Sequence, residues 1–206
     1  MKDNCVSIDE FWDLVISLKD DASRCLREID ETPEEDVVSK VFWRRMYARA
    51  VFALIETTTY RMTYHAYMAR ERPGVMFTPE ELERLTNAYD FKDDPDASAP
   101  VFTSRKQFLD DIEFAFRAFA RVHEAAYLLP IHRQEWGLMK GIARLRQDYQ
   151  YCRTREEAVV YPENVDTLVY GLLWFVECMV ALLESCADSI FTAATPGELE
   201  DNEAIM

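Results

Sequence analysis

The residues best suited to chemistry gather in one short stretch of the chain, residues 140–153. Lys140 and Arg144 are four residues apart and therefore share one face of a helix, while Arg146 lies on a different face. An arginine close to the C-terminal end of a helix also interacts favourably with the helix dipole. Taken alone, this stretch predicts a helix face that is either solvated or forms an interface.

Aromatic and imidazole side chains form a second candidate site. Tyr60, Tyr64, His65 and Trp136 could line an apolar pocket for a small ligand. The alternative is an aromatic core stripe, continued by Tyr67, whose hydroxyl groups reach the surface as amphipathic tyrosines usually do. Both interpretations stay open at this point.

The sequence predicts no metal site and no cofactor. Its histidines, His65, His123 and His132, are scattered, and no Glu-x-x-His motif occurs, so the ligand set of a di-iron bundle is missing. His123-Glu124 begins like the helix of a zinc protease, but Tyr127 stands where the second histidine is required. The glycine-rich motifs that hold phosphates or dinucleotides and the Gly-x-Ser-x-Gly motif of hydrolases are also absent.

Charge limits the classes of partner. The 206-residue chain carries 23 Lys and Arg against 38 Asp and Glu, a formal net charge of −15. The acidic excess lies at the two ends, 1–40 and 155–206, whereas 41–154 is slightly basic. Because nucleic acids and anionic membranes bind positive surfaces, we expect no membrane partner and only weak support for RNA. A local basic groove in the middle of the chain, or a protein partner, stays open.

Cysteine usage and the apolar segments predict a cytoplasmic protein. The five cysteines are an odd number without a Cys-x-x-Cys motif, which argues against a disulfide framework: Cys5, Cys25, Cys152, Cys178 and Cys186. The first residues lack the pattern of a signal peptide. The most apolar segment, Leu168–Leu183, is interrupted by Glu177 and is shorter than the roughly 20 residues that a membrane span needs.

The elements that hold these residues are predicted to be helices, because apolar residues recur with helical periodicity along most of the chain. We expect helices at about 8–30, 33–72, 79–89, 104–129, 134–151 and 163–191, an exposed loop at 90–100, and a frayed acidic tail at 196–206. Only five glycines occur and no pair of strands is indicated. The sequence therefore predicts a single all-α domain over 1–195, an up-and-down bundle of five or six helices.

Four helix starts carry capping signals. Ser7-Ile8-Asp9-Glu10 and Ser104–Gln107 have the capping-box spacing, in which two side chains satisfy free backbone N–H groups. Thr32-Pro33 and Thr78-Pro79 each place threonine as the cap and proline at the first helical position. Pro130 is expected to separate the fourth helix from the fifth.

A longer pattern resembles a known family. A long helix carries Trp43-Arg44-Arg45 and Ile55-Glu56, a later helix ends in Arg146–Tyr151, and a connector, 154–160, leads to Trp174-Phe175. This order is similar to that of the HEPN superfamily of helical bundles, over roughly residues 40–185. Members of that family typically carry an arginine, a polar residue, and a histidine four to six residues after the arginine.

The resemblance implies roles for the short motif. Arg146 matches the arginine and Gln147 the polar residue, but Tyr151 stands where the histidine is expected. HEPN-type proteins join as homodimers through the face that carries this motif. The resemblance therefore implies a cleft between subunits, with Arg144, Arg146, Gln147 and Tyr151 at its mouth and Arg146 paired to Glu56.

Catalytic HEPN proteins are metal-independent ribonucleases in which the arginine stabilises the phosphate. Tyrosine has an unperturbed pKa of about 10, so Tyr151 is a poor base at neutral pH. We therefore expect a non-cleaving, homodimeric binding or regulatory module. The first alternative is a ribonuclease that uses Arg146 and Tyr151, with Asp148 or His132 as an accessory acid or base. The second is the small-ligand bundle described above.

Overall fold

The computed structural model describes residues 8–87, 105–150 and 159–193, and these ranges form six helices without a strand. The helices are α1 (Ile8–Glu31), α2 (Val37–Ala69), α3 (Pro79–Asn87), α4 (Arg105–Val122), α5 (Trp136–Gln150) and α6 (Pro162–Ala193). The predicted all-α helical bundle is thereby confirmed.

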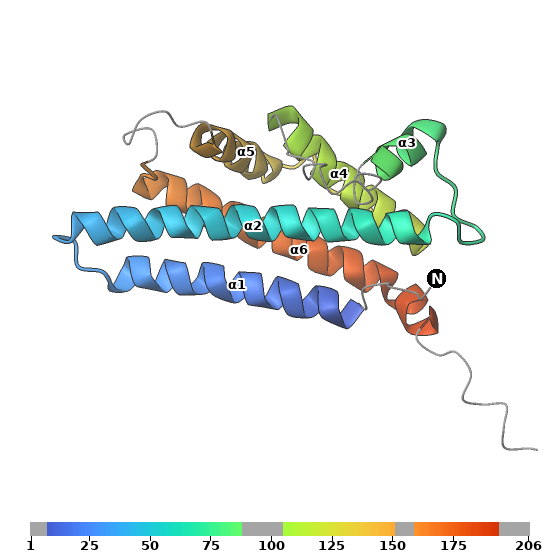
Figure 1. The fold of residues 1–206 in the computed structure, drawn as a ribbon, viewed down its shortest axis with the longest axis horizontal. Coiled ribbons are helices and arrows are strands. Elements are labelled where there is room, and N and C mark those ends of the chain that lie inside the picture. Colours follow the sequence, from blue (N-terminus) through green and yellow to red (C-terminus); the bar gives the residue numbers. More distant parts are fainter. Residues whose placement is uncertain (1–7, 88–104, 151–158, 194–206) are drawn as a thin grey trace, which may run out of the picture.

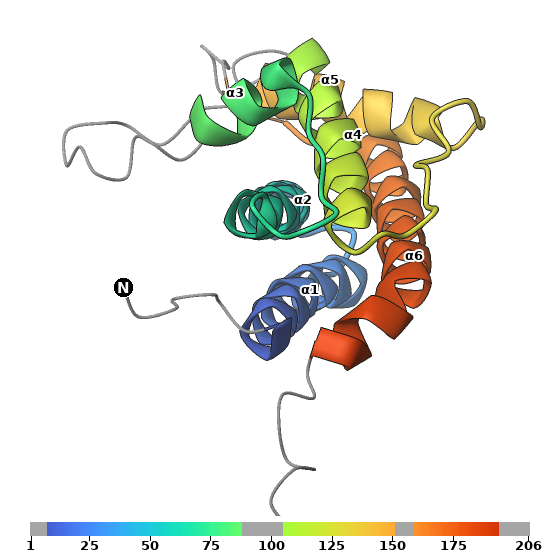
Figure 2. The ribbon, with the colours of Figure 1, turned by 90° about the vertical axis from the view of Figure 1, so that its right-hand side faces the viewer.

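Helix α2 is the spine of the bundle. Its 33 residues span about 50 Å at 1.5 Å per residue. Helix α1 lies antiparallel beside it, and α3, α4 and α6 pack against other parts of its surface (Figure 1). In the end-on view, α2 lies between α1 on one side and α4 on another, with α6 completing the bundle (Figure 2). The residues of α2 that the resemblance singled out therefore face several different neighbours.

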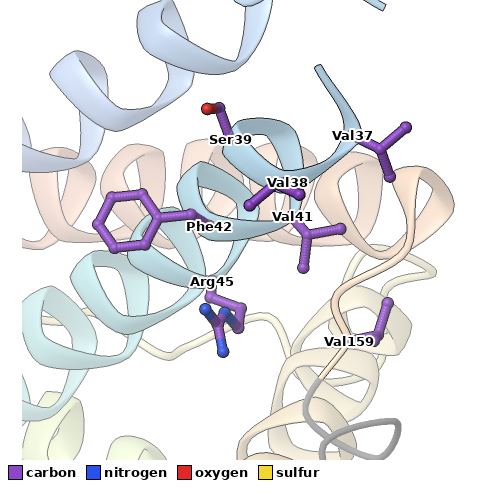
Figure 3. A pocket seen from close by; sticks show the side chains of 7 residues that line it. All are labelled: Val37, Val38, Ser39, Val41, Phe42, Arg45 and Val159. Carbon is purple, nitrogen blue, oxygen red and sulfur yellow. The ribbon is translucent and has the colours of Figure 1, made fainter. Parts of the chain in front are cut away.

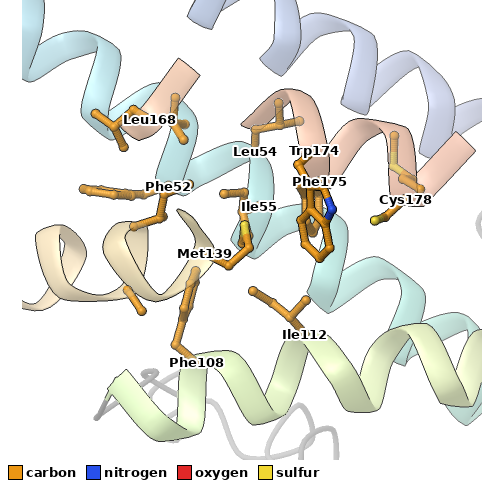
Figure 4. Close-up of a cluster of buried hydrophobic side chains, with 14 of the residues drawn as sticks. Phe52, Leu54, Ile55, Phe108, Ile112, Met139, Leu168, Trp174, Phe175 and Cys178 are labelled. Atoms are coloured by element: carbon orange, nitrogen blue, oxygen red, sulfur yellow. The ribbon is translucent and has the colours of Figure 1, made fainter. Parts of the chain in front are cut away.

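The main core fills the space between α2, α4, α5 and α6. Phe52, Ile55, Ile112, Met139 and Phe175 are buried there, with helices from both halves of the chain contributing (Figure 4). Each such side chain contributes on the order of 1.5–3 kcal/mol by leaving water. The core thus fixes the position of α5, the helix that carries Arg144 and Arg146.

A second buried cluster joins α3 to the C-terminal part of α2 and to α4. Ala66 and Ala69 of α2, Leu85 of α3, and Phe114 and Ala118 of α4 are all buried in it, together with Val122. Arg84 of α3 also forms an ion pair with Asp111 of α4. The short helix α3 is therefore held by both apolar packing and charge.

Two glycines let α5 and α6 approach closely. A Cβ atom added at Gly171 of α6 would lie 2.5 Å from Cδ1 of Ile142, and one added at Gly141 of α5 would lie 2.8 Å from Cγ2 of Thr167. Neither distance is compatible with van der Waals contact. Gly141, which weakens α5 as an isolated helix, thus serves the packing of α5 against α6.

Two helix ends differ from the sequence-based expectation. Helix α2 begins after Asp36, whose carboxylate accepts a hydrogen bond from the Ser39 N–H at 3.1 Å. Thr32, the expected cap, instead donates its hydroxyl to the Glu28 carbonyl at the end of α1. The reason is the turn at residues 33–36, closed by the Asp36 N–H to the Pro33 carbonyl.

Helix α4 ends at Val122, seven residues before the expected end. Glu124 has a left-handed backbone (φ 53°), the Ala125 N–H bonds to the Ala120 carbonyl, and the Glu124 N–H bonds to the Arg121 carbonyl. These two bonds form a Schellman motif, which closes a helix. Glycine or asparagine usually occupies the left-handed position, so glutamate there gave no signal in the sequence.

The remaining helix starts follow the prediction where they can be compared. At α3, the Thr78 hydroxyl accepts from the Glu81 N–H and the Glu81 carboxylate accepts from the Thr78 N–H, so this capping box is confirmed. The Ser7 and Ser104 capping boxes, the 90–100 loop and the 196–206 tail lie outside the described residues.

Helix α6 is longer and more apolar than expected. Over Pro162–Ala187 it has the length and composition of a membrane-crossing helix, and half of its most apolar window is buried inside the bundle. The expectation that the apolar segment is too short therefore fails, because the helix extends beyond Leu168–Leu183. The core helix of a globular protein meets the same criterion.

Candidate functional site

Arg146 lies inside the protomer. Its side chain is 3% exposed, its Nε–H donates to the Glu56 carboxylate of α2, and its guanidinium lies 5.2 Å from the centre of the Phe108 ring. The predicted pairing with Glu56 is confirmed. The structure differs, however, from the expectation that Arg146 stands at the mouth of a cleft, because α2 and α4 cover its guanidinium.

The charges near Arg146 continue toward α3. Asp111 of α4 pairs with Arg84, and Arg146 also acts on it electrostatically. Burial of this carboxyl group outweighs the two guanidinium groups and raises its pKa above the ordinary value. Arg146 is thus part of a largely buried set of charges that link α2, α4 and α5.

Arg144 has a different environment, at the edge of an open groove. The groove consists of two neighbouring parts, of about 660 and 450 Å³, and Val159 lines both of them. The larger part lies between α2, α5 and the start of α6. Besides Val159, its lining consists of Ala48, Phe52, Arg144, Leu145, Asp148, Tyr149, Val160, Tyr161, Asn164 and Leu168. The smaller part runs along the first turns of α2 and is lined by Val37, Val38, Ser39, Val41, Phe42 and Arg45 (Figure 3). We call the two parts together the α2–α5–α6 groove.

The groove combines apolar walls with two guanidinium groups. Val37, Val38 and Phe42 are exposed. Nε of Arg45 is buried and has no hydrogen-bond partner within the described part of the chain. No ion pair to Arg45 or Arg144 occurs among the described residues. An anionic group that entered the groove would therefore meet donors that are not already engaged.

The tyrosines and His65 do not form the predicted pocket with Trp136. Tyr60 and Tyr64 stack along α2 with their ring centres 6.4 Å apart, whereas Trp136 packs against Trp174 of α6 at 5.7 Å. Neither part of the described groove is lined by any of the four residues predicted for that pocket. The aromatic stripe interpretation agrees better with these contacts.

His65 has a partner that sequence spacing did not reveal, His123. The two rings are nearly parallel, with their centres 5.0 Å apart. Their Nε2 atoms are 3.0 Å apart, which is within hydrogen-bond distance. Burial lowers the pKa of both imidazoles to about 4, with a further contribution from Arg72 and, for His65, from His123. Near neutral pH both rings are uncharged, and one donates a hydrogen bond to the other.

The other predicted site residues give no catalytic arrangement. Asp148 lines the groove, and Gln147 is half-buried. His132 is exposed in the turn before α5, and Tyr151 lies outside the described residues. Burial raises the pKa of the Cys178 thiol to about 11, so this cysteine is protonated and a poor nucleophile near neutral pH.

Metal ligands do not converge within the described ranges. No group of three or more His, Cys, Asp or Glu side chains in residues 8–87, 105–150 and 159–193 could hold a metal ion. Comparison with known proteins adds no assignment: no family model matches the chain, and no match is found among curated proteins or solved structures. The functional argument therefore depends on the geometry alone.

Proposed function

We propose that this chain is a non-catalytic helical binding module and that it binds its partner in the α2–α5–α6 groove. The observation that carries the proposal is the contrast between two arginines on α5. Arg146 is buried and paired with Glu56, whereas Arg144 is exposed beside apolar walls. A guanidinium that stabilises a transferring phosphate must reach it, so the burial of Arg146 favours a structural role.

The HEPN-like resemblance stays part of the proposal, together with a homodimer and a cytoplasmic location. A partly apolar surface that could take part in a dimer lies on α6, where Tyr170, Leu173 and Val180 are 60%, 55% and 43% exposed and share one face of the helix with the exposed Glu177. The buried thiols of Cys178 and Cys186 are free, which fits a reducing compartment.

A nuclease assay tests the absence of catalysis. Purified protein is incubated with mixed single-stranded and structured RNAs in EDTA, and the expected result is no cleavage by the unchanged protein. The matched variants are Arg146→Ala and Arg144→Ala. Each removes one arginine side chain, and the two positions are two residues apart on α5. Cleavage by the unchanged protein that is lost in a folded Arg146→Ala variant would contradict the proposal. It would support the alternative that the protein is a ribonuclease.

The same two variants separate a structural from a surface arginine. Arg146→Ala leaves the partly buried Glu56 carboxylate without its partner and should lower the free energy of unfolding by about 3 kcal/mol. Arg144→Ala should change it by less than about 0.5 kcal/mol, because this side chain is exposed. Urea titrations followed by circular dichroism measure both values.

A further inference from the structure

From the groove we infer the class of partner: a peptide segment that carries carboxylate side chains between apolar ones. This inference rests on the proposed function, because it names what the binding module binds. The length of the groove, its charge and its apolar walls each favour such a peptide.

The length of the groove suits a peptide. Its lining runs along α2 from Val37 to Phe52, sixteen residues that span about 22 Å of helix axis. An extended peptide of about seven residues covers the same length at about 3.3 Å per residue. The groove is also open along its side, so a segment of a longer chain can enter without threading its end.

The charge of the groove selects carboxylates. Arg45 and Arg144 line its two parts, and no described carboxylate is ion-paired with either of them. These two arginines line the groove of a chain in which acidic side chains outnumber basic ones by 38 to 23. Arginine binds carboxylates through a planar fork of donors, which suits both side chains to this role.

The walls favour a peptide over RNA. Val37, Val38, Val41 and Val159 form aliphatic surface, which buries apolar side chains but offers nothing to a phosphodiester backbone. RNA carries one negative charge at every nucleotide, so a chain with a net charge of −15 repels it more strongly than a peptide that carries only a few carboxylates. A peptide can instead place a few carboxylates at the arginines and apolar side chains along the valines.

Selection from a random library tests the inference without choosing a sequence in advance. A phage library that displays random 12-residue peptides is panned against the full chain. We expect enriched peptides to share Asp or Glu residues flanked by apolar residues. No enrichment, or a consensus without acidic residues, would overturn the inference.

Binding of the best synthetic peptide is then measured by fluorescence anisotropy. Arg144→Glu and Arg45→Gln should each weaken binding at least tenfold, and Arg133→Glu is the control, because Arg133 is exposed and lines neither part of the groove. Arg144→Glu changes an exposed residue, so it keeps the test valid if Arg45→Gln fails to fold. Equal affinity in all variants would exclude the groove as the peptide site.

Two further experiments test whether the groove binds RNA or a second copy of the chain instead of a peptide. A 12-nucleotide single-stranded RNA that displaces the peptide at equal concentration would assign the groove to nucleic acid. Sedimentation of Arg144→Glu that shows a dissociated oligomer would assign it to a second copy of the chain. If the peptide selection fails and no RNA is cleaved, only this inference is overturned. If RNA is cleaved and the cleavage depends on Arg146, the proposed function is overturned.

Discussion

Arg144 and Arg146 show how two arginines separated by one residue acquire opposite roles. One turn of a helix is 3.6 residues, so a separation of two places them on nearly opposite faces. The face of Arg146 meets α2 and α4, where Glu56 and Phe108 receive it, while Arg144 points to the groove. The sequence predicted both the different faces and the partner Glu56. It could not predict which face would be buried, because that depends on how α5 packs against α4 and α6.

The His65–His123 pair makes the stability of the protein depend on pH. An unfolded imidazole titrates near pH 6.5, whereas both rings in the fold have a pKa of about 4. Between these values the unfolded chain binds more protons than the folded chain. Stability should therefore fall as the pH drops from about 6.5 to 4, by about 1–2 kcal/mol per imidazole.

Urea unfolding at pH 7, 5.5 and 4.5 measures this dependence. The comparison is between the unchanged protein and a His65→Gln, His123→Gln double variant, which should lose most of the slope. Arg72 is the charged residue that also acts on both rings, so Arg72→Gln should raise both pKa values and reduce the slope. The same slope in the unchanged protein and the double variant would show that other groups cause the effect.

At the scale of elements, the contact of α5 with α6 depends on a glycine. A side chain at position 171 must displace Ile142, which is fully buried and has no free space to enter. Gly171→Val should therefore lower the free energy of unfolding by about 1–3 kcal/mol through overpacking.

Gly137→Ala is the matched change on the facing helix. Nothing lies within 4 Å of a Cβ atom at that position, so alanine should be neutral or stabilise α5 by up to about 1 kcal/mol. Chemical denaturation of both variants gives the comparison. A Gly171→Val variant that is as stable as Gly137→Ala would contradict the conclusion that the close approach of α5 and α6 requires glycine.

The existence of the helices was predictable, whereas their ends were less so. The long segments α2 and α6 were predictable because apolar residues recur at helical spacing over many turns, although the buried residues of α2 face several neighbours. The end of α4 did not, since its left-handed residue is Glu124, where the usual signal is glycine. The start of α2 was misplaced because Thr32-Pro33 and Asp36 are both good starting signals, and only packing against α1 decides between them.

For the whole molecule, the exposed face of α6 formed by Tyr170, Leu173, Glu177 and Val180 predicts how two copies associate. Replacing Leu173 by Asp adds a second negative charge to this face and removes apolar surface from it. We expect the unchanged protein to sediment as a dimer and Leu173→Asp as a folded monomer with the same circular dichroism spectrum, because Leu173 is more than half exposed. Lys140→Asp, on the exposed surface of α5, is the control and should leave the dimer intact.

The functional site was only partly predictable. The sequence left open a local basic groove in the middle of the chain, and Arg144 was a candidate because the family resemblance placed it at the mouth of a cleft. Arg45, Val37, Val38 and Phe42 were missed as site residues, since nothing in the sequence distinguishes them from the apolar and charged positions of any amphipathic helix. The groove arises from the packing of α2, α5 and the start of α6, segments that are about a hundred residues apart.

The order of the helices along α2 also affects the protein during its synthesis. Helices α1 and α2 are neighbours in the sequence and can pair as soon as both have left the ribosome. The opposite side of α2, with Val51, Ile55 and Met62, must wait for α4 and α6 to be translated. Until then the nascent chain exposes this apolar surface to water, and exposed apolar surface of this kind favours aggregation and binding by chaperones.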